Sequence, residues 1–230
     1  MSLFAIGDLH LSFGSAKPMD IFSGWENYEK RLEKNWRALV KAGDTVVIAG
    51  DLSWAMSLDG ALKDFAFLHS LPGEKLLVKG NHDYWWSTKK KMESFFEEKG
   101  FNTIKIIHNN AYKAGGAAVC GTRGWLLEED EDGGRKVLER EAGRLKSSIE
   151  AAKKLGGEPI VFLHYPPLSE QAVSSELMTI LKNEQVKRCY YGHLHAQATR
   201  KAITGERGGI TFSLVSSDYI GFCPKLVEKY

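Results

Sequence analysis

The feature of this chain that most restricts its fold is a series of short apolar runs, each followed by polar residues. The runs have the length and composition of buried β-strands. Five of them occupy residues 3–6, 46–49, 76–78, 160–163 and 190–191. The polar clusters that follow them are Asp8-Leu9-His10, Gly50-Asp51, Gly80-Asn81-His82-Asp83, His164 and Gly192-His193-Leu194-His195. Because sites in α/β sheets form at the carboxyl ends of strands, we expect these clusters to meet at one rim.

The rest of the composition is that of an ordinary globular domain. The 230 residues are 43% hydrophobic and 26% charged, which is enough for one sizeable core. No linker divides the chain, so we expect a single domain over residues 1–230. The net charge of +2 argues against a protein that grips duplex nucleic acid. The apolar runs are far too short to span a membrane, so no membrane partner is expected.

Cysteine usage points to a reducing compartment. The cysteines Cys120, Cys189 and Cys223 are odd in number, widely spaced and outside any ligand motif. The chain also opens directly into a strand, without the basic segment of a signal peptide. We therefore predict no disulfide framework and a cytoplasmic location.

Apolar periodicity predicts an α/β arrangement. Expected helices, with apolar residues at three- and four-residue steps, cover residues 25–42, 58–70, 87–98, 135–155 and 173–183. Expected strands cover residues 3–7, 45–49, 75–79, 103–107, 117–120, 159–163, 188–191, 210–215 and 224–229. The early alternation favours βαβ units with parallel strands, and the later part adds hairpins. Together they predict two packed sheets with helices outside.

Two further segments are open to more than one interpretation. Ser87 is the expected cap of the helix over residues 87–98. The acidic stretch from Glu128 to Gly134 is expected to be an exposed loop, either solvated or acting as a lid.

The polar clusters contain more metal ligands than one ion can use. Residues two apart on an extended segment point the same way, so Asp8 and His10 can face one ion, as can His193 and His195. The full set of candidate ligands is Asp8, His10, Asp51, Asn81, His164, His193 and His195. Such a set suits two ions about 3.5–4 Å apart. Nitrogen and oxygen ligands without a thiolate favour Mn, Fe, Zn or Co over Mg or Ca.

The order of these motifs resembles that of the calcineurin-like metallophosphoesterase family. The matching set is Asp-x-His, Gly-Asp, Gly-Asn-His-Asp, His and Gly-His-x-His, and it runs from Asp8 to His195. The resemblance implies an α/β fold, a four-layer α/β/β/α sandwich of two mixed sheets flanked by helices. It also implies a phosphohydrolase with two divalent or trivalent ions, in which a metal-bridging hydroxide attacks the phosphate ester without a covalent intermediate.

The resemblance further implies a role for each residue of the set. The ligands of the first metal would be Asp8, His10 and His195, and those of the second Asn81, His164 and His193. Asp51 would bridge the two ions. His82 would face the substrate and assist the leaving group, and Asp83 could orient His82.

Some residues near the motifs have two reasonable interpretations. Asp83 could simply cap the helix that follows it, and His82 could be structural. Arg123, in Gly121-Thr122-Arg123-Gly124-Trp125, could clamp a phosphate oxygen or form a surface ion pair. The tryptophans near the motifs could wall a substrate pocket or fill the core. They are Trp54, Trp85, Trp86 and Trp125.

One departure from the family pattern bears on the substrate. The protein serine/threonine phosphatases of this superfamily carry Asp-Arg-Gly shortly after the bridging Asp, whereas here Asp51 is followed by Leu52-Ser53-Trp54. We therefore expect a phosphate ester of a small molecule or nucleotide. The alternatives are a nuclease or cyclic-nucleotide phosphodiesterase with the same site, or a non-catalytic interaction module. The last is disfavoured because such modules lose ligands, and this chain retains the full set.

Overall fold

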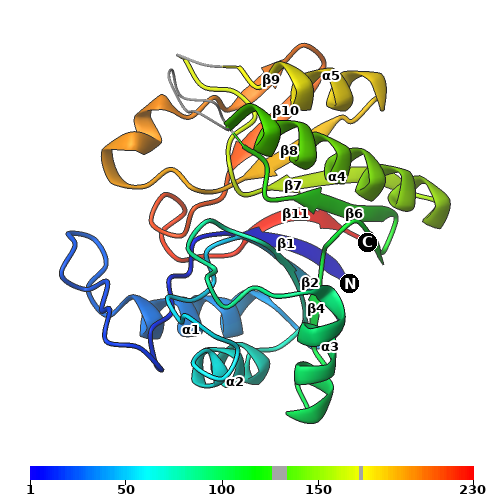
Figure 1. Cartoon of the computed structure of the whole chain (residues 1–230). Helices are drawn as coiled ribbons and strands as arrows, with labels where there is room; N and C mark the ends of the chain where they lie inside the picture. The colour runs from blue at the N-terminus through cyan, green and yellow to red at the C-terminus, as the bar shows by residue number, and fades with distance from the viewer. Residues whose placement is uncertain (126–133, 171–172) are drawn as a thin grey trace.

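Two mixed β-sheets pack face to face, and helices cover the outer face of each sheet (Figure 1). This is the predicted four-layer α/β/β/α arrangement. The structure, a computed structural model, describes residues 1–125, 134–170 and 173–230. The expected loop 128–134 falls outside the described residues except for Gly134, which begins a helix. Its role as a lid therefore stays a prediction.

The first sheet holds the amino-terminal strands. Its order is β11-β1-β2-β3-β4, and the strands are β1 (Ser2–Ile6), β2 (Thr45–Ala49), β3 (Glu74–Val78), β4 (Ile104–Ile106) and β11 (Lys225–Lys229). Strands β1 to β4 are parallel, and β11 pairs antiparallel with β1. The carboxyl ends of β1, β2 and β3 consequently lie at the same edge.

The second sheet has a parallel centre with a hairpin at each edge. Its order is β5-β6-β7-β8-β10-β9, and the strands are β5 (Tyr112–Ala114), β6 (Ala117–Thr122), β7 (Glu158–Leu163), β8 (Arg188–Tyr191), β10 (Ile210–Leu214) and β9 (Gly205–Arg207). Strands β6, β7, β8 and β10 are parallel, whereas β5 and β9 pair antiparallel with their neighbours. The later strands therefore add hairpins, as predicted, but only at the edges.

The helices pack on the outer faces through their apolar stripes. Helices α1 (Tyr28–Leu39), α2 (Leu62–Ser70) and α3 (Lys89–Glu98) cover the first sheet, and α4 (Gly134–Leu155) and α5 (Ser175–Asn183) cover the second (Figure 1). The longest is α4, with 22 residues. Across the described ranges, no helix combines the length and apolarity needed to cross a bilayer.

Three apolar clusters fill the spaces between the four layers. Along β1, Phe4 and Ile6 pack toward the helices, whereas Leu3 and Ala5 pack toward the second sheet. This is the alternation of a strand that is buried on both faces. It explains why the strands are continuous apolar runs in the sequence instead of alternating apolar and polar residues.

The helix starts differ from the predicted ones. Helix α1 begins at Tyr28, not at residue 25, because Asn27 adopts a left-handed conformation with φ 50° that an α-helix cannot include. The expected helix over residues 58–70 begins only at Leu62. Helix α3 is capped by Thr88, whose side chain accepts from the Lys91 amide, and not by the predicted Ser87.

Three short elements were not predicted. They are β5, β9 and a 3-10 helix η1 (Ala196–Lys201). Each has at most six residues, too few to show a periodic pattern.

Candidate metal centre

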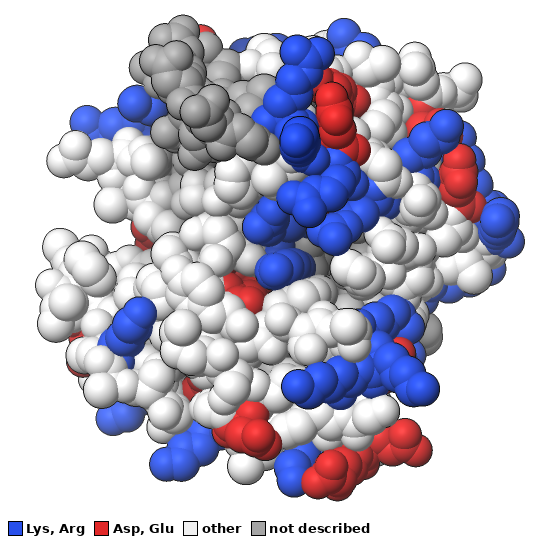
Figure 2. All heavy atoms as spheres, viewed as in Figure 1, with Lys and Arg blue, Asp and Glu red and all other residues white. Residues whose placement is uncertain are grey.

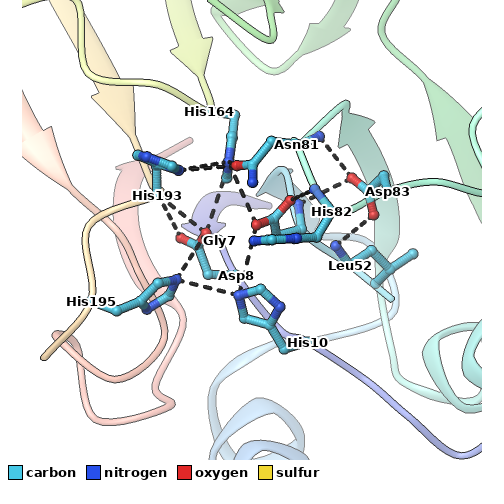
Figure 3. Close-up of polar contacts among 12 residues, drawn as sticks. Gly7, Asp8, His10, Leu52, Asn81, His82, Asp83, His164, His193 and His195 are labelled. Carbon is cyan, nitrogen blue, oxygen red and sulfur yellow. Dashed lines mark hydrogen bonds and ion pairs between the residues drawn. The ribbon is translucent and has the colours of Figure 1, made fainter. Parts of the chain in front are cut away.

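The polar clusters that follow five strands meet where the two sheets join (Figure 3). Strands β1, β2 and β3 of the first sheet and β7 and β8 of the second deliver them. The structure brings together all of the predicted ligands, namely Asp8, His10, Asp51, Asn81, His164, His193 and His195. Because they come from distant parts of the chain, only the tertiary fold creates this site.

The first group of ligands lies at the end of β1. Asp8 Oδ1 is 3.3 Å from His195 Nε2, and His10 Nε2 is 3.3 Å from the same nitrogen. One ligand atom from each residue lies within 4.8 Å of the others, so one ion could contact all three side chains. The predicted first-metal set is therefore geometrically compatible with an ion.

The second group contains two acceptor atoms that face each other, one on Asn81 and one on His164. His164 Nδ1 is 3.1 Å from the Ala49 carbonyl oxygen, so it carries the proton, and Nε2 of the neutral ring is left with a lone pair. That nitrogen lies 2.5 Å from Asn81 Oδ1, which is also an acceptor. His193 Nδ1 lies 3.0 Å from the same oxygen. Convergent lone pairs are what a bound cation requires, so these residues fit a metal ion.

Asp51 lies between the two groups. Its Oδ2 is 3.7 Å from His10 Nε2 and 3.6 Å from His164 Nε2, and one of its oxygens lies within 4.8 Å of ligand atoms from Asp8 and His164. Burial and the nearby Asp8 carboxylate raise the pKa of Asp51 to about 8. A cation between the two carboxylates would remove this repulsion, as expected at a bridging position.

The imidazoles divide into neutral and charged rings. Burial lowers the pKa of His10 and of His193 to about 3, which keeps both rings neutral and able to bind a metal. Burial acts in the same direction on His195, but the Asp8 charge and a hydrogen bond with Asp218 outweigh it and raise the pKa of His195 to about 10.

Four of the candidate ligands have a strained backbone conformation. Asp8, His10, Asp51 and His193 all have positive φ, between 45° and 73°. Non-glycine residues in this region cost free energy and gather at functional sites. Gly80 is required for close packing, since a Cβ there would lie 2.0 Å from Asp51 Oδ1.

Comparison with known proteins agrees with this geometry. The profile of the family described as calcineurin-like phosphoesterase matches residues 1–197. The chain belongs to this family. Its members are metal-dependent phosphoester hydrolases, which accounts for a nitrogen- and oxygen-rich ligand set at the sheet edge.

The individual relatives support the fold of this chain but do not identify its activity. An uncharacterized protein of Methanocaldococcus jannaschii is 35% identical over 92 residues, which is 40% of this chain and 43% of the relative. The chain is similar in structure to phosphopantetheinyl hydrolase of Mycobacterium tuberculosis, with a TM-score of 0.59, 14% identity, and 98% and 95% of the two chains covered. A protein of unknown function from Aquifex aeolicus gives a TM-score of 0.54 at 15% identity, with the same coverage.

His82 is half-buried at this candidate site. Its amide donates to Asp51 Oδ1 at 2.8 Å, which ties the histidine to the predicted bridging residue. The ring centroid lies 4.4 Å from that of Trp54, and the Trp54 ring also stacks on His10 at 4.8 Å. Burial lowers the pKa of His82. Trp54 thus packs on both histidines and also against the core cluster of the first sheet, and its role as the wall of a substrate pocket stays a prediction.

Asp83 braces two loops. Its carboxylate accepts from the amides of Gly80 at 2.7 Å, Asp51 at 3.0 Å and Leu52 at 2.9 Å, and from Trp85 Nε1 at 3.0 Å. Figure 3 shows the contact with Leu52. Among the described residues it forms no hydrogen bond with the His82 ring, so the predicted orientation of that ring by Asp83 is replaced by bracing of the backbone. The alternative of a helix cap is also not observed, because Thr88 caps α3.

Arg123 lies beside the site, at the end of β6. Its carbonyl oxygen accepts from the amides of His164 at 3.1 Å and Tyr165 at 2.9 Å. Its guanidinium lies over the Trp125 ring at 4.9 Å, with Nη2 3.9 Å from Oε1 of the buried Glu141. Because Glu141 is buried, this contact is not the surface ion pair that the sequence left open, and the role of Arg123 as a phosphate clamp stays a prediction.

Asp218 is a site residue that the sequence analysis missed. Its Oδ1 lies 3.0 Å from His195 Nδ1, and its Oδ2 accepts from the Ala196 amide at 2.8 Å. A carboxylate on the far nitrogen of a histidine fixes the ring for metal binding. The available signal was its position in the polar stretch Ser216-Ser217-Asp218, which follows β10 as the other clusters follow their strands.

Proposed function

We propose that this chain is a binuclear-metal phosphohydrolase that cleaves phosphate esters of small molecules or nucleotides. The observation that carries the proposal is a pair of acceptor atoms that face each other, with Asn81 Oδ1 2.5 Å from His164 Nε2. A site of this kind is incomplete without cations. Membership in a metal-dependent phosphoesterase family identifies the chemistry that such cations serve.

The ligands divide between two positions. Asp8, His10 and His195 would hold one ion, and Asn81, His164 and His193 the other, with Asp51 shared between them. Mn, Fe, Zn or Co suit these nitrogen and oxygen ligands. When bound, a pair of such ions neutralises phosphoryl oxygens and activates water as the nucleophile.

Three side chains near the proposed ions, those of Asp83, His82 and Trp54, would organise the site and assist the leaving group. Asp83 holds the loops after β2 and β3 in register, which places Asp51 and His82 relative to each other. His82 can donate a proton or a ring N–H hydrogen bond to the departing oxygen. Trp54 excludes water from one side of the histidine pair formed by His10 and His82.

The composition of the chain supports a proposed cellular location and a proposed size of substrate. Cys120, Cys189 and Cys223 are free, which supports the proposed cytoplasmic location. The low net charge supports a substrate smaller than duplex nucleic acid.

Metal analysis paired with a substrate screen tests the proposal. The purified chain is stripped with a chelator, reloaded with Mn, Fe, Zn, Co or Mg, and assayed on phosphomonoesters and phosphodiesters. We expect no hydrolysis by the stripped chain and recovery with Mn or a similar ion, at close to two ions per chain. Full activity of the stripped chain would overturn the proposal, and a strict diester preference would favour the phosphodiesterase alternative.

A further inference from the structure

The His82 ring has aromatic neighbours, although parts of the molecular surface are strongly basic. On the face shown in Figure 2, Lys and Arg side chains gather on both sides of a hollow between the two halves of the molecule, which would favour the approach of an anionic ester. The His82 ring instead lies near two aromatic rings, with its centroid 4.4 Å from that of Trp54 and 6.0 Å from that of Tyr84. The group proposed to assist the leaving oxygen is therefore held by uncharged neighbours.

Neither Asp83 nor Trp54 provides a hydrogen bond that would orient the His82 ring. Each carboxylate oxygen of the buried Asp83 already accepts from two or more N–H groups of other residues. Trp54 Nε1 is buried and has no hydrogen-bond partner in the part of the chain that the structure describes. The orientation of the ring therefore depends on another residue.

Tyr84 is placed to make this hydrogen bond. Its hydroxyl lies 3.4 Å from His82 Nδ1, and the two rings meet edge to face at an interplanar angle of 75°. The Tyr84 amide also donates to the His82 carbonyl oxygen at 2.8 Å, which closes a tight turn between the two residues. The residues on either side of Tyr84, Asp83 and Trp85, are buried. The backbone therefore holds the Tyr84 side chain against His82, although that side chain is exposed.

A hydrogen bond at Nδ1 determines which nitrogen of the neutral His82 ring carries the proton. A phenol hydroxyl can donate, and in a neutral imidazole one nitrogen carries a proton while the other offers a lone pair. If the hydroxyl donates to Nδ1, the ring proton is on Nε2, which can then donate to a departing oxygen. The opposite tautomer would place a lone pair at Nε2, opposite the lone pairs of that oxygen.

We infer that Tyr84 is a positioning residue for His82: its hydroxyl donates to Nδ1 and thereby presents the Nε2 N–H to the departing oxygen. The inference rests on the proposed function and deepens it, because it identifies the group that prepares the histidine for its role. Hydrogen bonds of catalytic groups are often long in the free enzyme and shorten when the substrate binds, which agrees with the distance of 3.4 Å.

Nitrogen-15 NMR of the metal-free full chain tests the hydrogen bond without relying on catalysis. The measurement is made where the ring is neutral, and the His82 signals are assigned by their loss in His82→Ala. In the wild type we expect a protonated Nε2 and an Nδ1 that accepts a hydrogen bond, which moves the Nδ1 resonance upfield. Tyr84→Phe, which loses only the hydroxyl, should move that resonance downfield.

Tyr112→Phe is the matched control for the NMR experiment. It removes a hydroxyl from β5, where that hydroxyl donates to the Ile106 carbonyl oxygen, and it should leave the His82 signals unchanged. A protonated Nδ1 in the wild-type neutral ring would overturn the inference, as would an identical Nδ1 resonance in the wild type and Tyr84→Phe.

A double-mutant cycle in the metal-loaded enzyme supplies the second measurement. Tyr84→Phe should lower kcat for an alkyl phosphate ester about 3–10-fold, the size expected for one neutral hydrogen bond, with KM and metal content unchanged. In the His82→Ala background the same substitution should have no effect. An equal loss of kcat in both backgrounds would show a merely structural role and overturn the inference. Absence of esterase activity in the wild type would overturn the proposed function, while the NMR experiment would still decide the role of Tyr84.

Discussion

The two ends of β3 both carry buried polar side chains, and their surroundings differ. At the amino end, the ammonium of the fully buried Lys75 donates to the Leu71 carbonyl oxygen and, at 3.2 Å, to Thr103 Oγ1. At the carboxyl end, Asn81 Oδ1 faces His164 Nε2 at 2.5 Å and His193 Nδ1 at 3.0 Å. A donor meets acceptors at the amino end, whereas the Asn81 and His164 acceptors face each other at the carboxyl end.

This difference separates a structural polar cluster from a ligand site. At Lys75 the chain itself satisfies the buried group, so nothing further needs to bind. Near Asn81 the chain supplies lone pairs and carboxylates in excess, and a bound cation would satisfy them. Burial alone would not distinguish the two clusters, whereas the identity of donors and acceptors does.

Replacement of His82, beyond the carboxyl end of β3, should have the largest effect on the rate of hydrolysis. A general acid matters most when the leaving oxygen is strongly basic, so His82→Ala should slow alkyl phosphate hydrolysis about 10²–10⁴-fold and nitrophenyl phosphate hydrolysis much less. The measurement is the ratio of the two rate losses, together with metal content, which should be nearly unchanged. His69→Ala, at the amino end of the sheet, is the control. Equal losses on both substrates would refute the leaving-group role.

Removal of the Asp51 charge should lower metal occupancy and turnover together. Asp51→Asn keeps the acceptor for the His82 amide but loses the carboxylate, so we expect at least about a 100-fold loss in metal affinity and a parallel loss in kcat/KM. Metal titration followed by assay gives both quantities. Asp59→Asn, an exposed residue of the following loop, should behave as wild type. Normal occupancy and turnover in Asp51→Asn would place the bridge elsewhere.

Asp218 should contribute through His195 and not by direct contact with a metal. Asp218→Ala should weaken metal binding about 10–100-fold, and Asp218→Asn, whose amide oxygen can still accept from His195 Nδ1, should weaken it less. Metal titration of the purified variants measures both, with the exposed Asp20→Asn as control. Identical affinities for wild type and Asp218→Ala would show that the carboxylate does not position the ring.

The smallest expected effect is on the free energy of unfolding, and it depends on Lys75 at the amino end of β3. Burial lowers the pKa of Lys75 from 10.5 to about 8, so between these values the unfolded chain binds more protons than the folded one. Stability should therefore rise as pH increases from 8 to 10.5, by an amount on the order of 3 kcal/mol. Urea unfolding at several pH values should show this rise in the wild type and in Lys113→Met, but not in Lys75→Met. A constant difference between wild type and Lys75→Met across this range would contradict the assignment.

The sequence determined the strands and the ligand motifs because both depend on local order. Strands buried on two faces must be continuous apolar runs, and β2 and β8 occupy the predicted residues 45–49 and 188–191. The motifs stand directly after such runs, so the parallel pairing of β1, β2 and β3 was enough to predict that Asp8, Asp51 and Asn81 lie close together.

The tertiary structure decided which partners the remaining polar groups have. Asp83 bonds the Asp51 amide 32 residues away, and Asp218 bonds His195 at a separation of 23 residues. No periodicity records such pairs, because a hydrogen bond between loops depends on how the loops are placed by the sheets. The start of α1 was likewise set by a single left-handed residue, Asn27. Local pattern thus fixes elements and motifs, and the packing of distant segments fixes which side chain each polar atom contacts.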